Sequence, residues 1–116
     1  MPITHIIVAP DLAGAVTERG SELTSAVRDI LVRDLGAKPE LVQVMITTAL
    51  TAPAGCAVLC EVQHRASPGR DAATRARAAQ NLHDLLHGVT GRSTRVRLIA
   101  LDPDHIAAAD TPETQP

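Results

Sequence analysis

Residues 21–50, SELTSAVRDILVRDLGAKPELVQVMITTAL, decide the fold of this chain. Apolar residues three and four positions apart predict an amphipathic helix from Glu18 to Leu35. These apolar positions are Leu23, Val27, Ile30, Leu31 and Leu35. Gly36 stands where a C-terminal cap belongs, and Pro39 prevents the helix from continuing far past it. Residues 41–50 then alternate between apolar and polar side chains, which predicts a strand directly after the helix.

A short β-branched run, Ile3 to Ala9, precedes this helix and is closed by Pro10. Its almost uninterrupted apolar character is typical of a strand that is covered on both faces. A strand, a helix and a second strand make one crossover unit. We therefore expect the two strands to lie parallel in one sheet with a right-handed connection.

The same order of elements returns in the second half of the chain. A strand is expected from Cys56 to Gln63, a helix from about Asp71 to Leu86 and a strand from Thr94 to Leu101. The sequence thus predicts an α/β (α+β) domain of two successive β-α-β units, which form a four-stranded mixed sheet with two helices on one face. Residues 1–110 are expected to be this single domain, and residues 111–116 a frayed tail.

The composition is that of a globular protein of 116 residues, with 45% hydrophobic and 21% charged residues. The chain has no Phe, Tyr or Trp, so its core must be aliphatic and small, which favours oligomerisation. Without aromatic side chains, bases have no stacking platform, and we do not expect nucleic acid as a partner. No segment has the apolar length of a signal peptide or a membrane span, so we expect a cytoplasmic protein with no membrane partner.

Cysteines and charges add two expectations. Cys56 and Cys60 are four residues apart in an apolar run, so a single strand would place both on one face as reduced core residues. They complete no metal motif, and no metal is expected. Between Val62 and Ala100 there are seven arginines and only two acids, Asp71 and Asp84. This local excess of positive charge favours an anionic ligand, or otherwise a solvated helix face.

Three stretches and the second residue carry a resemblance to a known family. They are LGAKPELVQVMI (35–46), SPGRDAATR (67–75), RVRLIALDPDHIAAAD (95–110) and the proline that follows the initiator methionine. In this order, over nearly the whole chain, they resemble the tautomerase superfamily. The first stretch is similar to 4-oxalocrotonate tautomerase-like proteins. The other two resemble macrophage migration inhibitory factor and 5-carboxymethyl-2-hydroxymuconate isomerase.

The resemblance implies site residues and an assembly. Pro2, freed by removal of Met1, would be the catalytic base, because a secondary amine near cations in a partly apolar pocket is less basic than in water. Arg70 and Arg75 would hold the carboxylate of a small anionic substrate, and Lys38 would contact it. The resemblance implies no cofactor, and a homotrimer. No aromatic residue stands on the expected last strand, so Asp102 or water remains as the general acid.

Three functions follow as hypotheses. The leading one is a cofactor-independent tautomerase or isomerase that moves a proton on a small 2-oxo or 2-hydroxy-dienoic carboxylic acid. The first alternative is a non-catalytic trimeric binding or scaffold protein of the same fold, especially if Met1 is retained. The second alternative is a ferredoxin-like sensor domain, which also has two β-α-β units but pairs them by antiparallel interleaving and usually forms dimers.

Overall fold

The computed structural model describes residues 2–111 and 113, so Met1 and most of the tail predicted for 111–116 lie outside the described residues. The chain forms four strands and three helices in these residues. In chain order they are β1 (Ile3–Val8), α1 (Ala13–Glu18), α2 (Gly20–Leu35), β2 (Gln43–Thr48), β3 (Val58–Arg65), α3 (Ala72–Thr90) and β4 (Thr94–Leu101). Short 3₁₀ turns cover Pro10–Leu12, Pro39–Leu41 and Pro103–His105.

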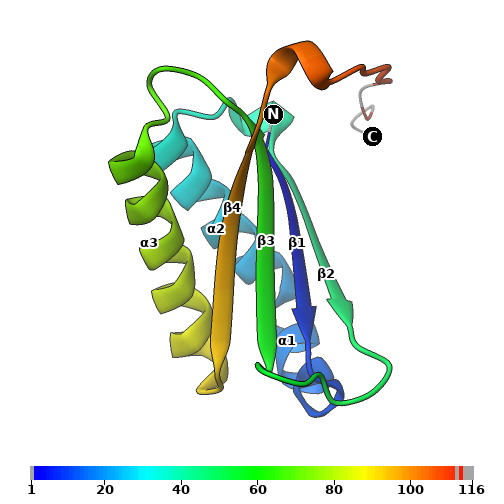
Figure 1. The fold of residues 1–116 in the computed structure, drawn as a ribbon. Helices are drawn as coiled ribbons and strands as arrows, with labels where there is room; N and C mark the ends of the chain where they lie inside the picture. The colour runs from blue at the N-terminus through cyan, green and yellow to red at the C-terminus, as the bar shows by residue number, and fades with distance from the viewer. Residues whose placement is uncertain (1, 112, 114–116) are drawn as a thin grey trace.

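The sheet has the order β2-β1-β3-β4 (Figure 1). The outer pairs, β1 with β2 and β3 with β4, are parallel, and the central pair β1 with β3 is antiparallel. Each parallel pair is one crossover unit, so the predicted four-stranded mixed sheet of two β-α-β units is confirmed. The parallel outer pairs exclude the ferredoxin-like alternative, whose units interleave their strands in antiparallel pairs.

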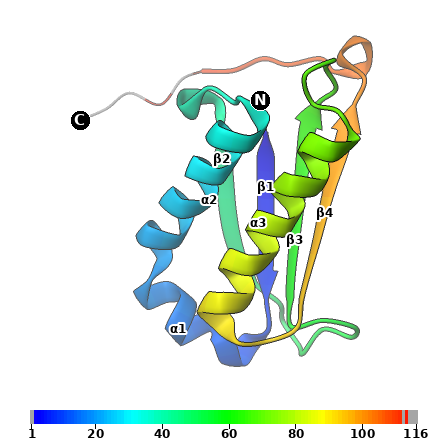
Figure 2. The same cartoon turned by 90° about the vertical axis from the view of Figure 1, so that its left-hand side faces the viewer.

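All helices lie on one side of the sheet (Figure 2). Alternate residues of the two central strands are buried beneath them: Thr4, Ile6 and Val8 from β1, and Val58, Cys60, Val62 and His64 from β3. The helices contribute aliphatic side chains to the same core, mainly Leu23, Val27, Leu31, Leu35, Ala78, Leu82 and Leu86. The core is therefore aliphatic, as the composition requires.

The first helical segment differs from the prediction at its start. A separate helix, α1, covers Ala13–Glu18, and α2 begins only at Gly20. Arg19, at the junction, has φ −111° and ψ 15°, outside helical geometry. The prediction missed α1 because two of its residues, Gly14 and Thr17, are weak helix formers. Val16 of α1 is buried nonetheless.

The two later elements are shifted relative to the prediction. β3 starts at Val58, so Cys56 precedes the strand and is half-buried, and the expectation that both cysteines share a strand face is wrong. Cys60 is buried, and burial raises the pKa of its thiol to about 12. The helix α3 runs to Thr90 rather than Leu86, because its left-handed cap is Gly91, with φ 65°.

A polar contact joins α2 to α3. The carboxylate of Asp34 accepts hydrogen bonds from Asn81 Nδ2 at 2.7 Å and from Arg33 Nε at 3.0 Å. Burial acts to raise the pKa of Asp34, but the two hydrogen bonds, together with the charges of Arg33 and Arg77, hold the pKa below its ordinary value. The contact lies near the C-terminal end of α2 and helps to fix that end against α3.

The face of the sheet opposite the helices is only partly covered. Here Met45 is 51% exposed and Ile99 39% exposed, beside the half-buried Ile3, Ile7 and Leu59. His5 Nε2 and Thr47 Oγ1, 2.8 Å apart, are hydrogen-bonded on the same face. Among the apolar residues of β3, Leu59 lies on this face, whereas Val58 and Val62 point toward the helices. We call Ile3, Ile7, Met45, Leu59 and Ile99 the open-face cluster.

We predict that Leu82→Ala lowers the free energy of unfolding by about 2–5 kcal/mol, because it leaves a cavity in a close-packed core. Leu82 is fully buried between α3 and the sheet. The matched control is Leu50→Ala, since Leu50 is 98% exposed and its loss removes almost no packing. Urea unfolding of the two variants measures the difference, and equal stabilities would contradict this description of the core.

Candidate functional site

One end of the sheet gathers every residue that the sequence singled out for the site. This end holds the start of β1 with Pro2, the loop before β2 with Lys38, and the end of β3 (Figure 1). The segment that follows β3 supplies Arg70, and the first turns of α3 supply Arg75. We call this the proline end. The antiparallel pairing of β1 with β3 produces it, because the start of one strand meets the end of the other.

Pro2 is buried at the start of a central strand. Its carbonyl accepts a hydrogen bond of 3.0 Å from the backbone N–H of Gln43, at the start of β2. The β1 to β3 register pairs Ile3 with Gln63, so the next pair along would be Pro2 and His64. Pro2 thus lies between two strands, with its position fixed by backbone bonding.

Arg70 spans the gap between β3 and α2. Its Nε donates to the carbonyl of Leu35 at 3.0 Å, and its Nη1 donates to the carbonyl of Arg65 at 3.1 Å. The side chain is half-buried as a result. A guanidinium has five N–H groups, so these two bonds fix its plane and leave further donors for an anion.

Arg75 lies one turn into α3 and is also half-buried, with its Nε donating to the carbonyl of Arg70 at 3.3 Å. Asp71 is the N-cap residue of α3, and its carboxylate accepts a hydrogen bond from the N–H of Thr74 at 2.8 Å. This hydrogen bond lowers the pKa of Asp71. The first turn is therefore capped by the chain's own carboxylate.

Lys38 is exposed in the loop between α2 and β2. Arg65 and Arg77 also have exposed side chains. Asp102, the candidate general acid, follows β4 and accepts a hydrogen bond from the N–H of Asp104 at 3.0 Å. It is exposed at the proline end as well.

A cavity of about 350 Å³ opens at this end. It is lined by Leu35, Gly36, Arg65, Ala66, Ser67, Arg70 and Pro103. Two of these residues are arginines and none is acidic, so the cavity suits a small anion. Pro2 is not among the lining residues, so the structure joins Arg70 to the cavity but does not bring Pro2 into it.

His64 is a residue of this end that the sequence analysis did not select. It is 0% exposed and lies under the helices at the end of β3. Burial lowers the pKa of the His64 imidazole, and the positive charges of Arg70 and Arg75 lower it further. The hydrogen bond to the Arg65 carbonyl acts in the opposite direction but does not outweigh them. The signal that could have found it is the alternation of 58–65, which puts His64 in step with buried Val58, Cys60 and Val62.

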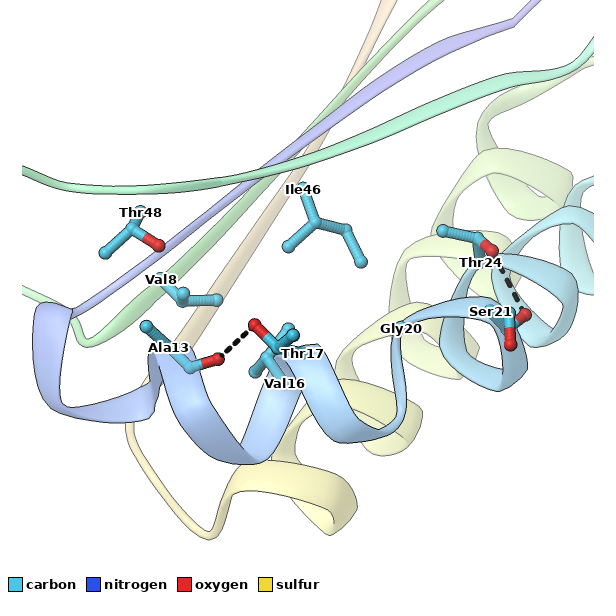
Figure 3. Close-up of a pocket in the computed structure, with 9 residues that line it drawn as sticks. All are labelled: Val8, Ala13, Val16, Thr17, Gly20, Ser21, Thr24, Ile46 and Thr48. Carbon is cyan, nitrogen blue, oxygen red and sulfur yellow. Dashed lines mark hydrogen bonds between the residues drawn. The ribbon is translucent and has the colours of Figure 1, made fainter.

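A second cavity, of about 420 Å³, lies at the opposite end of the sheet (Figure 3). It is lined by Val8, Ala13, Val16, Thr17, Gly20, Ser21, Thr24, Ile46 and Thr48. Two hydroxyls are already used, since Thr17 Oγ1 donates to the carbonyl of Ala13 and Thr24 Oγ1 to that of Ser21. Because its lining has no charged or titratable side chain, this cavity has no group for proton transfer or for holding a carboxylate.

Among residues 2–111 and 113, no three side chains of His, Cys, Asp or Glu cluster as a metal ion would need. Across the same residues, no helix has the length and apolar character to span a bilayer.

Several known proteins resemble this chain in structure. No protein-family model and no curated protein matches the sequence. Among solved structures, Pt0534 inactivated by 2-oxo-3-pentynoate aligns with a TM-score of 0.74 and 21% identity over 92% of each chain. A macrophage migration inhibitory factor-like protein from Entamoeba histolytica aligns with a TM-score of 0.71 and 13% identity, over 93% of this chain and 95% of that one.

A fused 4-OT, described as a wild-type symmetric trimer, aligns with a TM-score of 0.70 and 17% identity, over 93% of this chain and 92% of that one. These structural neighbours are members of the tautomerase superfamily. Nearly the whole chain is covered in each case. The chain therefore has the tautomerase fold, as the resemblance in the sequence predicted.

We predict that stability falls as the pH drops from 7.5 to 5.5. The pKa of His64 is lower in the folded chain than the ordinary 6.5, so below about pH 6.5 the unfolded chain binds a proton that the folded chain does not. The free energy of unfolding then decreases by up to about 1.4 kcal/mol per pH unit. Urea unfolding at the two pH values measures this loss.

His64→Leu should flatten that pH dependence, because the buried titrating group is gone. The control is His105→Gln, which changes an exposed imidazole and should leave the dependence in place. A His64→Leu variant with the same pH dependence as the wild type would show that His64 is not the group responsible.

Proposed function

We propose that the chain with Met1 removed is a cofactor-independent tautomerase or isomerase. Pro2 would take a proton from carbon or enol oxygen of a small 2-oxo or 2-hydroxy-dienoic acid and return it elsewhere on the same molecule. Arg70 and Arg75 would hold the substrate carboxylate, and exposed Lys38 would contact it. The main supporting observation is that Pro2, Arg70 and Arg75 all lie at the same end of the sheet in a tautomerase fold.

The chemistry of these groups supports the proposal. Removal of Met1 turns the Pro2 nitrogen from an amide into a secondary amine, which can accept a proton. Burial and nearby guanidinium groups both disfavour the protonated amine, so part of it is free base at neutral pH. The planar guanidinium of Arg70, braced by two carbonyls, suits a carboxylate because both oxygens can bond to it. The neighbour Pt0534 is inactivated by a 2-oxo acid, 2-oxo-3-pentynoate.

The proposal extends to assembly and location. The open-face cluster leaves large apolar side chains partly exposed, and such faces are normally covered. A second and a third copy of the chain would cover it in a homotrimer, the state in which the fused 4-OT neighbour is described. The free thiols of Cys56 and Cys60 fit the reducing cytoplasm. The proposal involves neither nucleic acid nor membrane as a partner.

One observation favours the alternative of a non-catalytic trimeric binding or scaffold protein. Both Nε and Nη1 of Arg70 are already bonded to backbone carbonyls, as in an arginine that braces a loop. In that case the cavity at the proline end would still bind a small anion. The two functions differ in turnover, which only the first requires.

We predict that the processed protein speeds ketonisation of the enol of a small 2-oxo acid, and that protein retaining Met1 does not. Pro2→Ala should lower kcat/KM by roughly 10²–10⁴-fold, the usual loss for a general base. Decay of the enol's ultraviolet absorbance measures the rate, and intact mass shows which form is present. Equal rates for the processed and Met1-retaining forms would refute the mechanism, and inactivity of both would favour the binding protein.

We predict that the protein sediments as a trimer at micromolar concentration. Leu59→Glu should dissociate it, because it buries a charge in the proposed interface. Leu50→Glu is the matched control, since Leu50 lies in the exposed loop between β2 and β3. Sedimentation velocity distinguishes the states, and a wild-type monomer would contradict the proposed assembly.

A further inference from the structure

The carbonyl oxygen of Arg65 is a shared acceptor at the proline end. It lies 3.0 Å from Nδ1 of His64 and 3.1 Å from Nη1 of Arg70. Because a carbonyl only accepts, Nδ1 carries the imidazole proton and donates it. Arg70 also donates through its Nε to the carbonyl of Leu35. Arg70 is therefore tied on one side to α2 and on the other to a carbonyl that His64 also holds.

His64 is an unusual residue for this position. It is 0% exposed, and its Nε2 has no hydrogen-bond partner among the described residues. Thr4 Oγ1, on the neighbouring strand β1 and the same face, also lacks a partner in that part of the chain. Leaving a buried polar atom unpaired costs free energy. A leucine would fill the space without that cost, so packing alone does not explain a histidine here.

We propose that His64 is a positioning residue for Arg70, the arginine that would hold the substrate carboxylate. The inference rests on the proposed function. The imidazole is packed between the sheet and the helices, so its Nδ1–H fixes the direction of the Arg65 carbonyl. That carbonyl in turn fixes Nη1, and the plane of the guanidinium is set toward the cavity lined by Arg65, Ser67 and Arg70. The substrate carboxylate would then bind a guanidinium group that is already oriented, rather than a mobile side chain.

Two amide variants separate this role from simple packing. In His64→Asn, the side-chain nitrogen takes the place of Nδ1 and still donates to the Arg65 carbonyl. In His64→Gln, the nitrogen takes the place of Nε2, so a side chain of similar polarity has no donor at the required position. We expect KM to rise about 10- to 100-fold in the Gln variant and to stay within about threefold of wild type in the Asn variant. The turnover number kcat should be little changed in both.

His64→Leu gives a readout that a purely structural role would not produce. We expect its urea midpoint at pH 7.5 to equal or exceed that of wild type, because the unpartnered nitrogen is removed, while its KM rises as in the Gln variant. A lower midpoint with an unchanged KM would mean that His64 only supports the fold. Equal KM values for the Asn and Gln variants would also overturn the proposal.

A direct measurement keeps this test independent of catalysis. The Nη1–H group of Arg70 that donates to the Arg65 carbonyl should give a guanidinium NMR signal protected from solvent exchange, assigned by its absence in Arg70→Lys. The protection should persist in His64→Asn and be lost in His64→Gln. Absence of turnover in processed wild type would end the proposed function, whereas unchanged protection in His64→Gln would end the positioning role.

Discussion

The antiparallel pairing of β1 with β3 is the constraint on which the rest of the molecule depends. It joins two parallel crossover units into one sheet and sets Ile3 opposite Gln63. Through this register the first residues of the chain meet the last residues of β3. A shift by one residue would turn every side chain of β1 to the other face, and the buried set of Thr4, Ile6 and Val8 would then point away from the helices.

The same pairing concentrates positive charge where the chain begins. Strand β3 leads into the segment with Arg70, and α3 starts beside it with Arg75. Both side chains are held by backbone carbonyls, so the charges keep a defined place instead of moving in solvent. Because ordered guanidinium groups need no rearrangement to bind an anion, they would suit the carboxylate of the proposed substrate, whereas the uncharged cavity at the opposite end offers no such group.

Much of the fold could be predicted from the sequence because its signals are local. The spacing of Leu23, Val27 and Leu31 on α2 and the cap at Gly36 are properties of short stretches. The boundaries of β3 could not be predicted, since Cys56 and Ala57 are as apolar as the strand that follows them. Helix α1 was missed for a related reason. Its Gly14 and Thr17 give little helical signal, and the packing of Val16 into the core holds it.

The candidate site was predicted in part. The resemblance to the tautomerase superfamily implies Pro2, Arg70, Arg75 and Lys38 as site residues, and the structure brings all four to one end of the sheet. His64 was not selected, because one histidine in an apolar strand has no motif. The positioning role proposed for it depends on the shared carbonyl of Arg65, a contact that only three-dimensional positions reveal. The bracing of Arg70 by Leu35, 35 residues earlier in the chain, was beyond sequence reasoning for the same reason.

The pKa of the Pro2 nitrogen tests the central claim most directly, since it reports whether the proline end converts a chain terminus into a base. Protein with Met1 removed and with ¹⁵N-labelled proline can be titrated by NMR, following the Pro2 nitrogen. The account predicts a pKa below that of the same Pro2 nitrogen in the urea-unfolded chain, because burial and the nearby arginines oppose its protonation. A pKa in the folded protein equal to or above the unfolded value would contradict the account.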